Sequence, residues 1–124
     1  MINILTGLVA AVLSFIANRF LFAQLGSEGV VYLIPLGEEI FKTGIAYYLG
    51  ANLISTHLVF GILEAGLDFV YSNSLAALLA VITHLLLGIV TFYSLLLNNN
   101  LTVAIMIAIV VHTAWNFLIR GLKP

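Results

Sequence analysis

Residues 75–97 read LAALLAVITHLLLGIVTFYSLLL, and this stretch contains no Asp, Glu, Lys or Arg. A helix of this length rises about 35 Å, which is enough to cross the roughly 30 Å hydrocarbon core of a bilayer. A surface helix of a soluble protein would show a polar face instead. The stretch therefore predicts a transmembrane helix.

The composition of the whole chain supports this prediction. Of its 124 residues 63% are hydrophobic and only 7% are charged, whereas about a quarter of a soluble domain is charged. So much apolar surface needs lipid as its solvent, which makes the lipid bilayer an expected partner. Four Lys and Arg against five Asp and Glu leave no basic face, which excludes nucleic acid as a partner. The absence of Cys excludes disulfides, thiolate metal sites and a Cys nucleophile.

Small or polar breaks at residues 26–29, 50–52, 72–74 and 98–100 divide the chain into five apolar segments. Because the connections are short, successive helices are antiparallel neighbours in one bundle. The predicted fold is all-α, a polytopic membrane helix bundle of about five transmembrane helices in a single domain over residues 1–124. The predicted spans are residues 2–23, 30–49, 53–71, 75–97 and 101–119.

The few terminal cations predict the orientation of the chain. Arg19, Arg120 and Lys123 fall on one side of a five-span protein, and the positive-inside rule places that side in the cytoplasm. We therefore expect an integral multi-pass protein with its N-terminus outside and its C-terminus in the cytoplasm. The first segment lacks a basic start and a small-residue cleavage site, so we expect a retained helix there.

Most of the charged residues lie inside the predicted spans. Each costs roughly 2.5 to 3.5 kcal/mol near the centre of a membrane helix. Such groups must be protonated, paired or turned toward a wet cavity, and they are functional candidates by default. The charged residues concerned are Glu38, Glu39, Lys42, Glu64 and Asp68.

Four predicted helices place a polar side chain in the same layer of the membrane. Counting about 1.5 Å per residue puts Glu38, Glu64, His84 and His112 roughly 11 to 14 Å from the cytoplasmic ends of their spans. Side chains four positions apart share a helical face, which adds three residues to the faces that carry this layer: Lys42, Phe60 and Asn116. Four glycines near the layer are expected to allow close helix approach or access to the backbone: Gly37, Gly61, Gly66 and Gly88.

Each of these residues also has a simpler interpretation. Glu38 and Lys42 can form a structural ion pair, and a histidine within a span can be a hydrogen-bonded packing residue. His57 lies nearer the outer end of its helix and Asp68 lies near the cytoplasmic interface, so both are predicted to be peripheral. These interpretations leave the common depth of the polar layer unexplained.

Several kinds of chemistry fit such a layer. Carboxylates and imidazoles around a wet pocket suit hydrolysis, with Glu as general base, His exchanging protons and His with Asn stabilising an oxyanion. Two His and a Glu can also bind catalytic Zn²⁺, although the chain contains no His-Glu-x-x-His sequence. A proton- or cation-coupled carrier should show a polar path or inverted repeats, and neither is visible. A non-catalytic scaffold or immunity-like protein would leave the costly polar layer unexplained.

The polar residues also form an ordered set of motifs: Glu38-Glu39-x-x-Lys42, Phe60-x-x-x-Glu64, an isolated His84, and His112-x-x-x-Asn116. This set resembles the PrsW branch of the superfamily of CAAX prenyl endopeptidases and bacteriocin-processing or immunity proteins, which are glutamic-type intramembrane proteases. CAAX-type members have EExxxR and FxxxH instead. That difference disfavours cleavage of prenylated proteins.

The resemblance implies an intramembrane endopeptidase of a prokaryotic cell membrane, acting on membrane proteins or peptides. It implies that Glu38 or Glu39 activates water and that the other motif residues hold the water or stabilise the oxyanion. The expected catalytic residues are Glu38, Glu39, Glu64, His84, His112 and Asn116, with Lys42 and Phe60 in support. Neither a metal ion nor another cofactor is expected.

Overall fold

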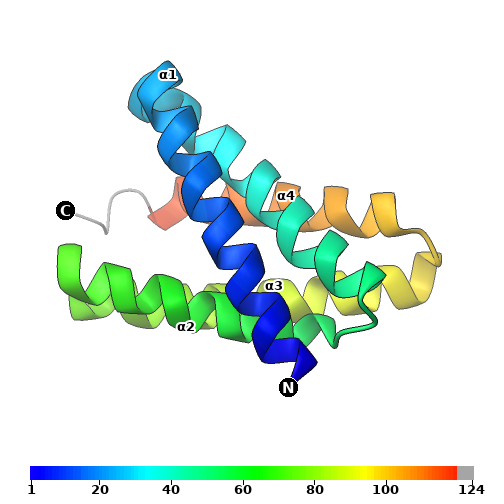
Figure 1. Cartoon of the computed structure of the whole chain (residues 1–124). Coiled ribbons are helices and arrows are strands. Elements are labelled where there is room, and N and C mark those ends of the chain that lie inside the picture. The colour runs from blue at the N-terminus through cyan, green and yellow to red at the C-terminus, as the bar shows by residue number, and fades with distance from the viewer. Residues whose placement is uncertain (120–124) are drawn as a thin grey trace.

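The computed structural model describes residues 1–119, and the side chains of residues 26–31 are not described. This part of the chain is all-helical and contains no strand. Its helices are α1 (Ile2–Tyr48), α2 (Leu53–Tyr71), α3 (Ser74–Asn98) and α4 (Leu101–Ile119), arranged as a bundle (Figure 1). The prediction of an all-α helix bundle is confirmed.

Helix α1 folds back on itself. A straight helix of its 47 residues would be about 70 Å long, yet the backbone N–H of Asn52 donates to Oδ1 of Asn3 at 2.9 Å. Halfway along, Nδ2 of Asn18 donates to Oε1 of Glu38 at 2.9 Å. These contacts require two antiparallel arms, which Figure 1 shows in blue and in cyan to green. We call Ile2–Leu25 the first arm and residues 32–48 the second arm.

The predicted break at residues 26–29 divides the two arms of α1, but it is not a gap in the helical backbone. The backbone of α1 is helical from Ile2 to Tyr48, so residues 2–23 and 30–49, which were predicted as separate spans, belong to one element. Because the two arms are antiparallel, the chain reverses direction between them, as the prediction of five segments requires.

The other three breaks are confirmed, and asparagine side chains explain them. Asn52 accepts a hydrogen bond from the N–H of Ser55 at 2.9 Å, and Asn73 accepts one from Ala76 at 2.8 Å, which caps the start of α2 and of α3. Asn99 has a φ of 47°, the left-handed conformation that asparagine tolerates at a helix end. The predicted ends of the last three spans agree with α2, α3 and α4 to within one residue.

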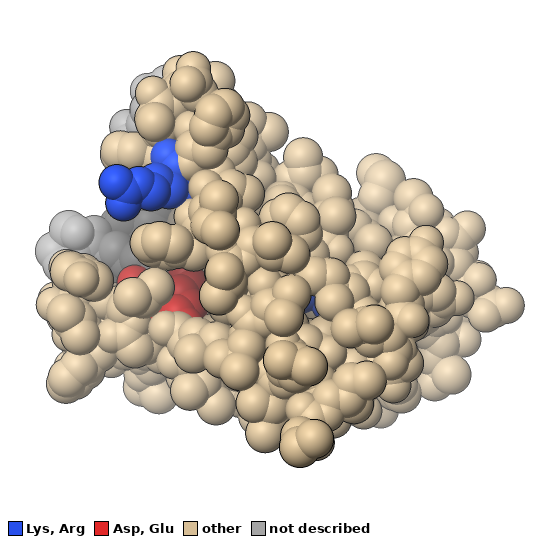
Figure 2. Space-filling view, in the orientation of Figure 1, with Lys and Arg blue, Asp and Glu red and all other residues tan. Residues whose placement is uncertain are grey.

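The bundle buries polar side chains and exposes apolar ones. Buried hydrophobic residues are mostly small, such as Ala46, Ala80 and Ala108, while large ones such as Leu97 and Phe117 are exposed. The face in Figure 2 is almost entirely uncharged. This distribution is the opposite of that in a soluble domain, and it suits a protein whose outer solvent is lipid.

Four stretches are long and apolar enough to cross a membrane: the first arm of α1, α2, α3 and α4. These helices are compatible with an integral membrane protein. The second arm of α1 contains Glu38, Glu39 and Lys42, and its charges are turned into the bundle, where all three side chains are buried.

Two glycines allow α2 and α3 to pack closely beside the polar layer. A Cβ added at Gly61 would lie 2.7 Å from Cβ of His84, and one added at Gly88 would lie 2.9 Å from Cβ of His57. Both distances are too short for real side chains, so these positions need glycine. The other two glycines, Gly37 and Gly66, do not serve close helix approach, because no described atom lies within 4 Å of a Cβ added at either position.

Candidate functional site

Lys42 lies at the centre of the polar layer and is completely buried. Its Nζ is 2.6 Å from Oε1 of Glu39 and 3.8 Å from Oε2 of Glu38, which confirms the predicted contact with this acidic pair. Nζ is also 3.0 Å from Nδ1 of His84 on α3 and 4.4 Å from the centre of the Phe60 ring on α2. The lysine therefore joins three helices at one point.

Glu39 is the acid that holds this cluster together. Its Oε1 contacts Lys42 and also lies 2.8 Å from Nδ1 of His112 on α4, while its Oε2 lies 3.1 Å from Nε2 of His57 on α2. Both carboxylate oxygens are thus occupied, and the side chain is 0% exposed. Glu39 has a structural place in the cluster and offers no free oxygen to a substrate.

His57 belongs to the cluster, so the prediction that it is peripheral is wrong. It is completely buried, and its Nδ1 donates to the carbonyl oxygen of Leu53 at 2.9 Å, which turns Nε2 toward Glu39. Its position was judged along α2 alone, whereas its partner Glu39 lies on the second arm of α1. The signal that could have found it is its spacing: His57 and Glu64 are seven residues apart, on one face of α2.

His84 connects Lys42 to Glu64. An ammonium group has no acceptor, so Lys42 donates to Nδ1 of His84, and the ring proton lies on Nε2, which donates to Oε2 of Glu64. The hydrogen-bond network thereby assigns a neutral ring with one tautomer. The ring also lies 4.9 Å from the Phe60 ring and 5.4 Å from the His112 ring, centre to centre. Both nitrogens of His84 are committed to holding neighbours in place.

Glu38 differs from Glu39 because it reaches a cavity. Its Oε1 accepts the hydrogen bond from Asn18, and its Oε2 lies 3.9 Å from Nε2 of His112. That gap is too long for a direct hydrogen bond and of the right size for a bridging water. His112 donates to Glu39 through Nδ1, so its Nε2 presents a lone pair toward Glu38.

Two cavities meet this cluster. The larger one, of about 230 Å³, lies between the first arm of α1 and α2, and Glu38 and Glu64 are among its lining residues. A second cavity of about 10 Å³ is lined by Glu64, His84, His112 and Asn116, and its volume is about that needed for one water molecule. Five of the six predicted catalytic residues therefore line these two cavities, and Glu39 is the exception.

The larger cavity also includes residues that the sequence did not single out. Ser14 and Asn18 come from the first arm of α1, where no site residue was predicted, and Asp68 comes from the last turns of α2. Asp68 is half-buried close to the end of α2, as its predicted place near an interface requires, and it also lines this cavity. The sequence does contain a signal for Asn18. Its amide side chain lies within an apolar span, and burying an amide there costs free energy unless it is hydrogen-bonded.

Glu38, His84 and His112 could also hold a metal ion, because one ligand atom from each lies within 4.8 Å of the others. Two Nε2 or Nδ1 atoms and a carboxylate are a ligand set that zinc accepts. In the observed arrangement the Lys42 cation lies 3.0 Å from His84 and 3.8 Å from Glu38. A divalent cation would have to displace this ammonium group or Glu64 from His84.

No protein-family model, curated protein or solved structure matches the chain. The functional interpretation therefore depends on the side-chain geometry of the cluster and on the motif resemblance.

Proposed function

We propose that the chain is an intramembrane endopeptidase in which Glu38 activates the attacking water. The supporting observation is the position of Glu38 at the cavity wall, with Oε1 held by Asn18 and Oε2 directed toward Nε2 of His112 at 3.9 Å. A general base needs a free lone pair within reach of water and a fixed orientation. Oε2 of Glu38 meets both requirements, whereas the oxygens of Glu39 are occupied.

The proposed reaction is hydrolysis of a peptide bond. Oε2 of Glu38 takes a proton from water, and the hydroxide oxygen bonds to the carbonyl carbon of the substrate. The proton then passes from Glu38 to the amide nitrogen as the carbon–nitrogen bond breaks, which leaves a carboxylic acid and an amine and restores the Glu38 carboxylate. His112 Nε2 faces the same point and can exchange this proton with Glu38.

The remaining motif residues orient this pair and stabilise charge. Glu39 holds the Nδ1 side of His112 and is itself held by Lys42 and His57. Asn116 lies beside His112 at the small cavity, where its amide can donate to the oxyanion of the tetrahedral intermediate. Glu64 and His84 fix Lys42 from the other side of the cluster.

The substrates proposed for this site are membrane proteins or membrane-associated peptides. The cluster lies within helices that are apolar on the outside, so a peptide bond reaches it from the bilayer or its surface. The expected setting is a prokaryotic cell membrane, with the N-terminus outside and the C-terminus in the cytoplasm.

A reconstituted assay with a panel of single-span peptides tests the proposal. Glu38→Gln keeps the acceptor for Asn18 but removes the base, so we expect a loss of about 10² to 10⁴ in rate with wild-type thermal stability. Asn116→Ala should cost about 10² to 10³, and Ser94→Ala on α3 should cost nothing. Cleavage that survives Glu38→Gln would refute the role of Glu38. Folded protein that hydrolyses no panel peptide would favour the scaffold or carrier interpretation.

A metal-dependent peptidase is the second candidate, and the grouping of Glu38, His84 and His112 favours it. In that case chelators abolish cleavage and added Zn²⁺ restores it. The glutamate mechanism predicts unchanged rates with a chelator, measured on the same peptides. Lys42 close to two of the three ligands is the reason that we prefer the glutamate mechanism.

A further inference from the structure

Two side chains on the first arm of α1 have buried polar atoms without a partner. Oγ of Ser14 and Oδ1 of Asn18 make no hydrogen bond to any described residue, and Ser14 is 1% exposed. A buried polar atom without a partner costs free energy. Both residues line the larger cavity beside Glu38, so a ligand in this cavity can recover part of that cost.

Ser14 differs from most other buried hydroxyls of the bundle. A hydroxyl within a helix commonly donates to the carbonyl oxygen four residues earlier. Three threonines do so, at 2.6 to 2.8 Å: Thr6, Thr83 and Thr91. The hydroxyls of Thr43 and Thr56 also lack a partner among the described residues, but they line neither cavity. Within the described part of the chain, Ser14 therefore supplies the one unpartnered hydroxyl in the wall beside Glu38.

The amide of Asn18 has a free half that also belongs to this wall. An ionised carboxylate only accepts hydrogen bonds, so Nδ2 of Asn18 is the atom that faces Oε1 of Glu38, at 2.9 Å, and Oδ1 is left for another donor. This Nδ2 is the only side-chain N–H among the described residues that line the cavity. The wall beside Glu38 therefore suits a ligand that donates hydrogen bonds.

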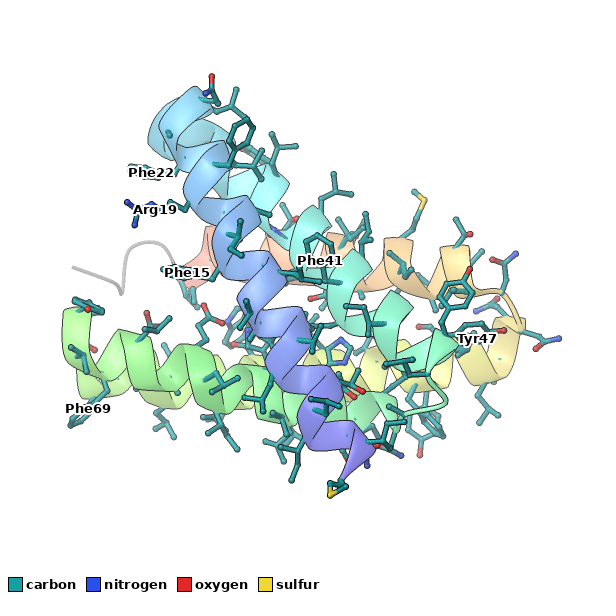
Figure 3. The ribbon with its side chains drawn as sticks, in the orientation of Figure 1. Phe15, Arg19, Phe22, Phe41, Tyr47 and Phe69 are labelled. Atoms are coloured by element: carbon teal, nitrogen blue, oxygen red, sulfur yellow. The ribbon has the colours of Figure 1, made fainter. Side chains whose placement is uncertain are left out.

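The cavity continues toward the surface that is expected to face lipid. A hollow of about 340 Å³ with apolar lining shares four residues with the cavity: Ala11, Phe15, Leu63 and Leu67. Phe15 is 54% exposed, and Figure 3 shows it projecting from the same side of the first arm as Phe22. The apolar side chains of a membrane segment can therefore pack here while its backbone reaches Ser14 and Asn18.

The spacing of the two acceptors fits an extended peptide. Ser14 and Asn18 are four positions apart on one face of the helix, a rise of about 6 Å. In an extended chain the N–H groups of residues i and i+2 point to the same side and lie about 6.4 to 6.8 Å apart. Oγ of Ser14 and Oδ1 of Asn18 can therefore each accept from one N–H of the same extended segment.

We propose that Ser14 and Asn18 bind the main chain of the substrate by accepting hydrogen bonds from two N–H groups of an extended segment beside Glu38. This inference depends on the proposed function, because it states how the same site holds its substrate. A membrane helix that opens around one peptide bond loses backbone hydrogen bonds, which is costly where water is scarce, and these acceptors compensate for part of the loss. The favoured substrate has glycine near the cut bond, because glycine weakens a helix.

Single ester replacements in a substrate peptide test this inference. Each ester replaces one backbone N–H by an oxygen atom, which removes the donor and keeps the chain length. Binding of a fluorescent single-span peptide with a central glycine to the Glu38→Gln protein in lipid nanodiscs measures the effect without cleavage. Esters at two positions, two residues apart, should each weaken binding about two- to tenfold, the contribution of one hydrogen bond.

Ser14→Ala identifies the partner of one of these groups. Added to Glu38→Gln, it should abolish the effect of one ester and leave the effect of the other, which is thereby assigned to Asn18. Because Ser14→Ala removes a hydroxyl without a partner, unfolding in SDS should need as much SDS as before or more. Thr43→Val is the matched control, since its buried hydroxyl also lacks a described partner but lies outside both cavities. It should leave both ester effects unchanged.

The remaining outcomes contradict the inference. If no ester weakens binding, or if every ester has the same effect with and without Ser14→Ala, the two acceptors bind water or another group instead of the main chain. A peptide that does not bind at all overturns the inference as well. Cleavage by wild-type protein without any ester effect would leave the proposed function intact, whereas the expected ester effects without cleavage would support the main-chain site and refute the peptidase.

Discussion

At the residue scale, Lys42 is held by groups from three helices. Its ammonium group contacts Glu39 on its own helix, His84 on α3 and the Phe60 ring on α2. The Lys42 ammonium group is 0% exposed, so it depends on its partners. Removing one ion of a buried pair leaves the other charge uncompensated, and this costs more free energy than the intact pair contributes to stability. The cluster is therefore sensitive to loss of one member and tolerant of loss of a matched pair.

Lys42→Met should strongly destabilise the protein. The substitution leaves Glu39 buried without its counter-ion, a change that costs about 3 to 5 kcal/mol in comparable pairs. Unfolding by SDS titration in mixed micelles measures the difference. Adding Glu39→Gln to Lys42→Met should restore part of the lost stability. Arg19→Met is the matched control, because it removes an exposed cation. It should change the free energy of unfolding by no more than about 0.5 kcal/mol.

His57→Ala should also destabilise the protein, by about 1 to 3 kcal/mol, because it removes a hydrogen-bond partner of Oε2 of buried Glu39. His57→Gln retains a donor and should recover part of this loss. The same SDS titration compares the free energies of unfolding of the His57→Ala and His57→Gln proteins. Equal stability of His57→Ala and wild-type protein would mean that the contact between His57 and Glu39 contributes nothing.

The sequence predicts the members of the cluster that repeat at helical spacing and share a depth, such as Glu38, Lys42 and His112. It does not predict Asn18 or the importance of His57. Depth counted along separate helices treats them as parallel cylinders, whereas α1 folds back and its two arms bring Asn18 against Glu38. Which polar residues meet therefore depends on how the helices cross, and counting positions along separate helices does not give those crossings.

At the element scale, glycine sets the distance between α2 and α3. His84 on α3 packs against Gly61 on α2, and His57 on α2 packs against Gly88 on α3. Close approach of the two backbones brings Phe60 and Glu64 within reach of His84. The sequence indicates that such glycines exist, but it does not distinguish these from Gly66, which faces outward.

Gly61→Ala should therefore destabilise the bundle by about 1 to 3 kcal/mol, the usual cost of adding a methyl group where there is no space. Gly66→Ala on the same helix is the matched control, because an added Cβ meets no described atom within 4 Å. It should be neutral or should stabilise α2 by up to about 1 kcal/mol through helix propensity. SDS titration of both variants checks the difference, and equal values would show that the helices can separate without cost.

At the scale of the whole molecule, the distribution of polarity matches a chain that folds within lipid. Apolar side chains provide little drive for helix association there, so small residues and internal hydrogen bonds must hold the bundle together. The structure has both: close glycine contacts between α2 and α3, and a polar cluster that joins all four helices. The costly charges of the second arm are consequently part of what holds the helices together.

The number and direction of membrane crossings can be measured. If both arms of α1 cross the membrane and the N-terminus lies outside, as the terminal cations predict, Gln24 and Ser72 lie on the cytoplasmic side and Asn98 lies on the outer side; all three are exposed. Because the chain contains no Cys, single substitutions to Cys give unambiguous labelling with an impermeant maleimide in oriented vesicles. We expect Asn98→Cys to label from outside, and Gln24→Cys and Ser72→Cys to label only after the membrane is opened. Labelling of Gln24→Cys from the same side as Asn98→Cys would mean that the first arm does not cross with the others, and the five-span arrangement would then be wrong.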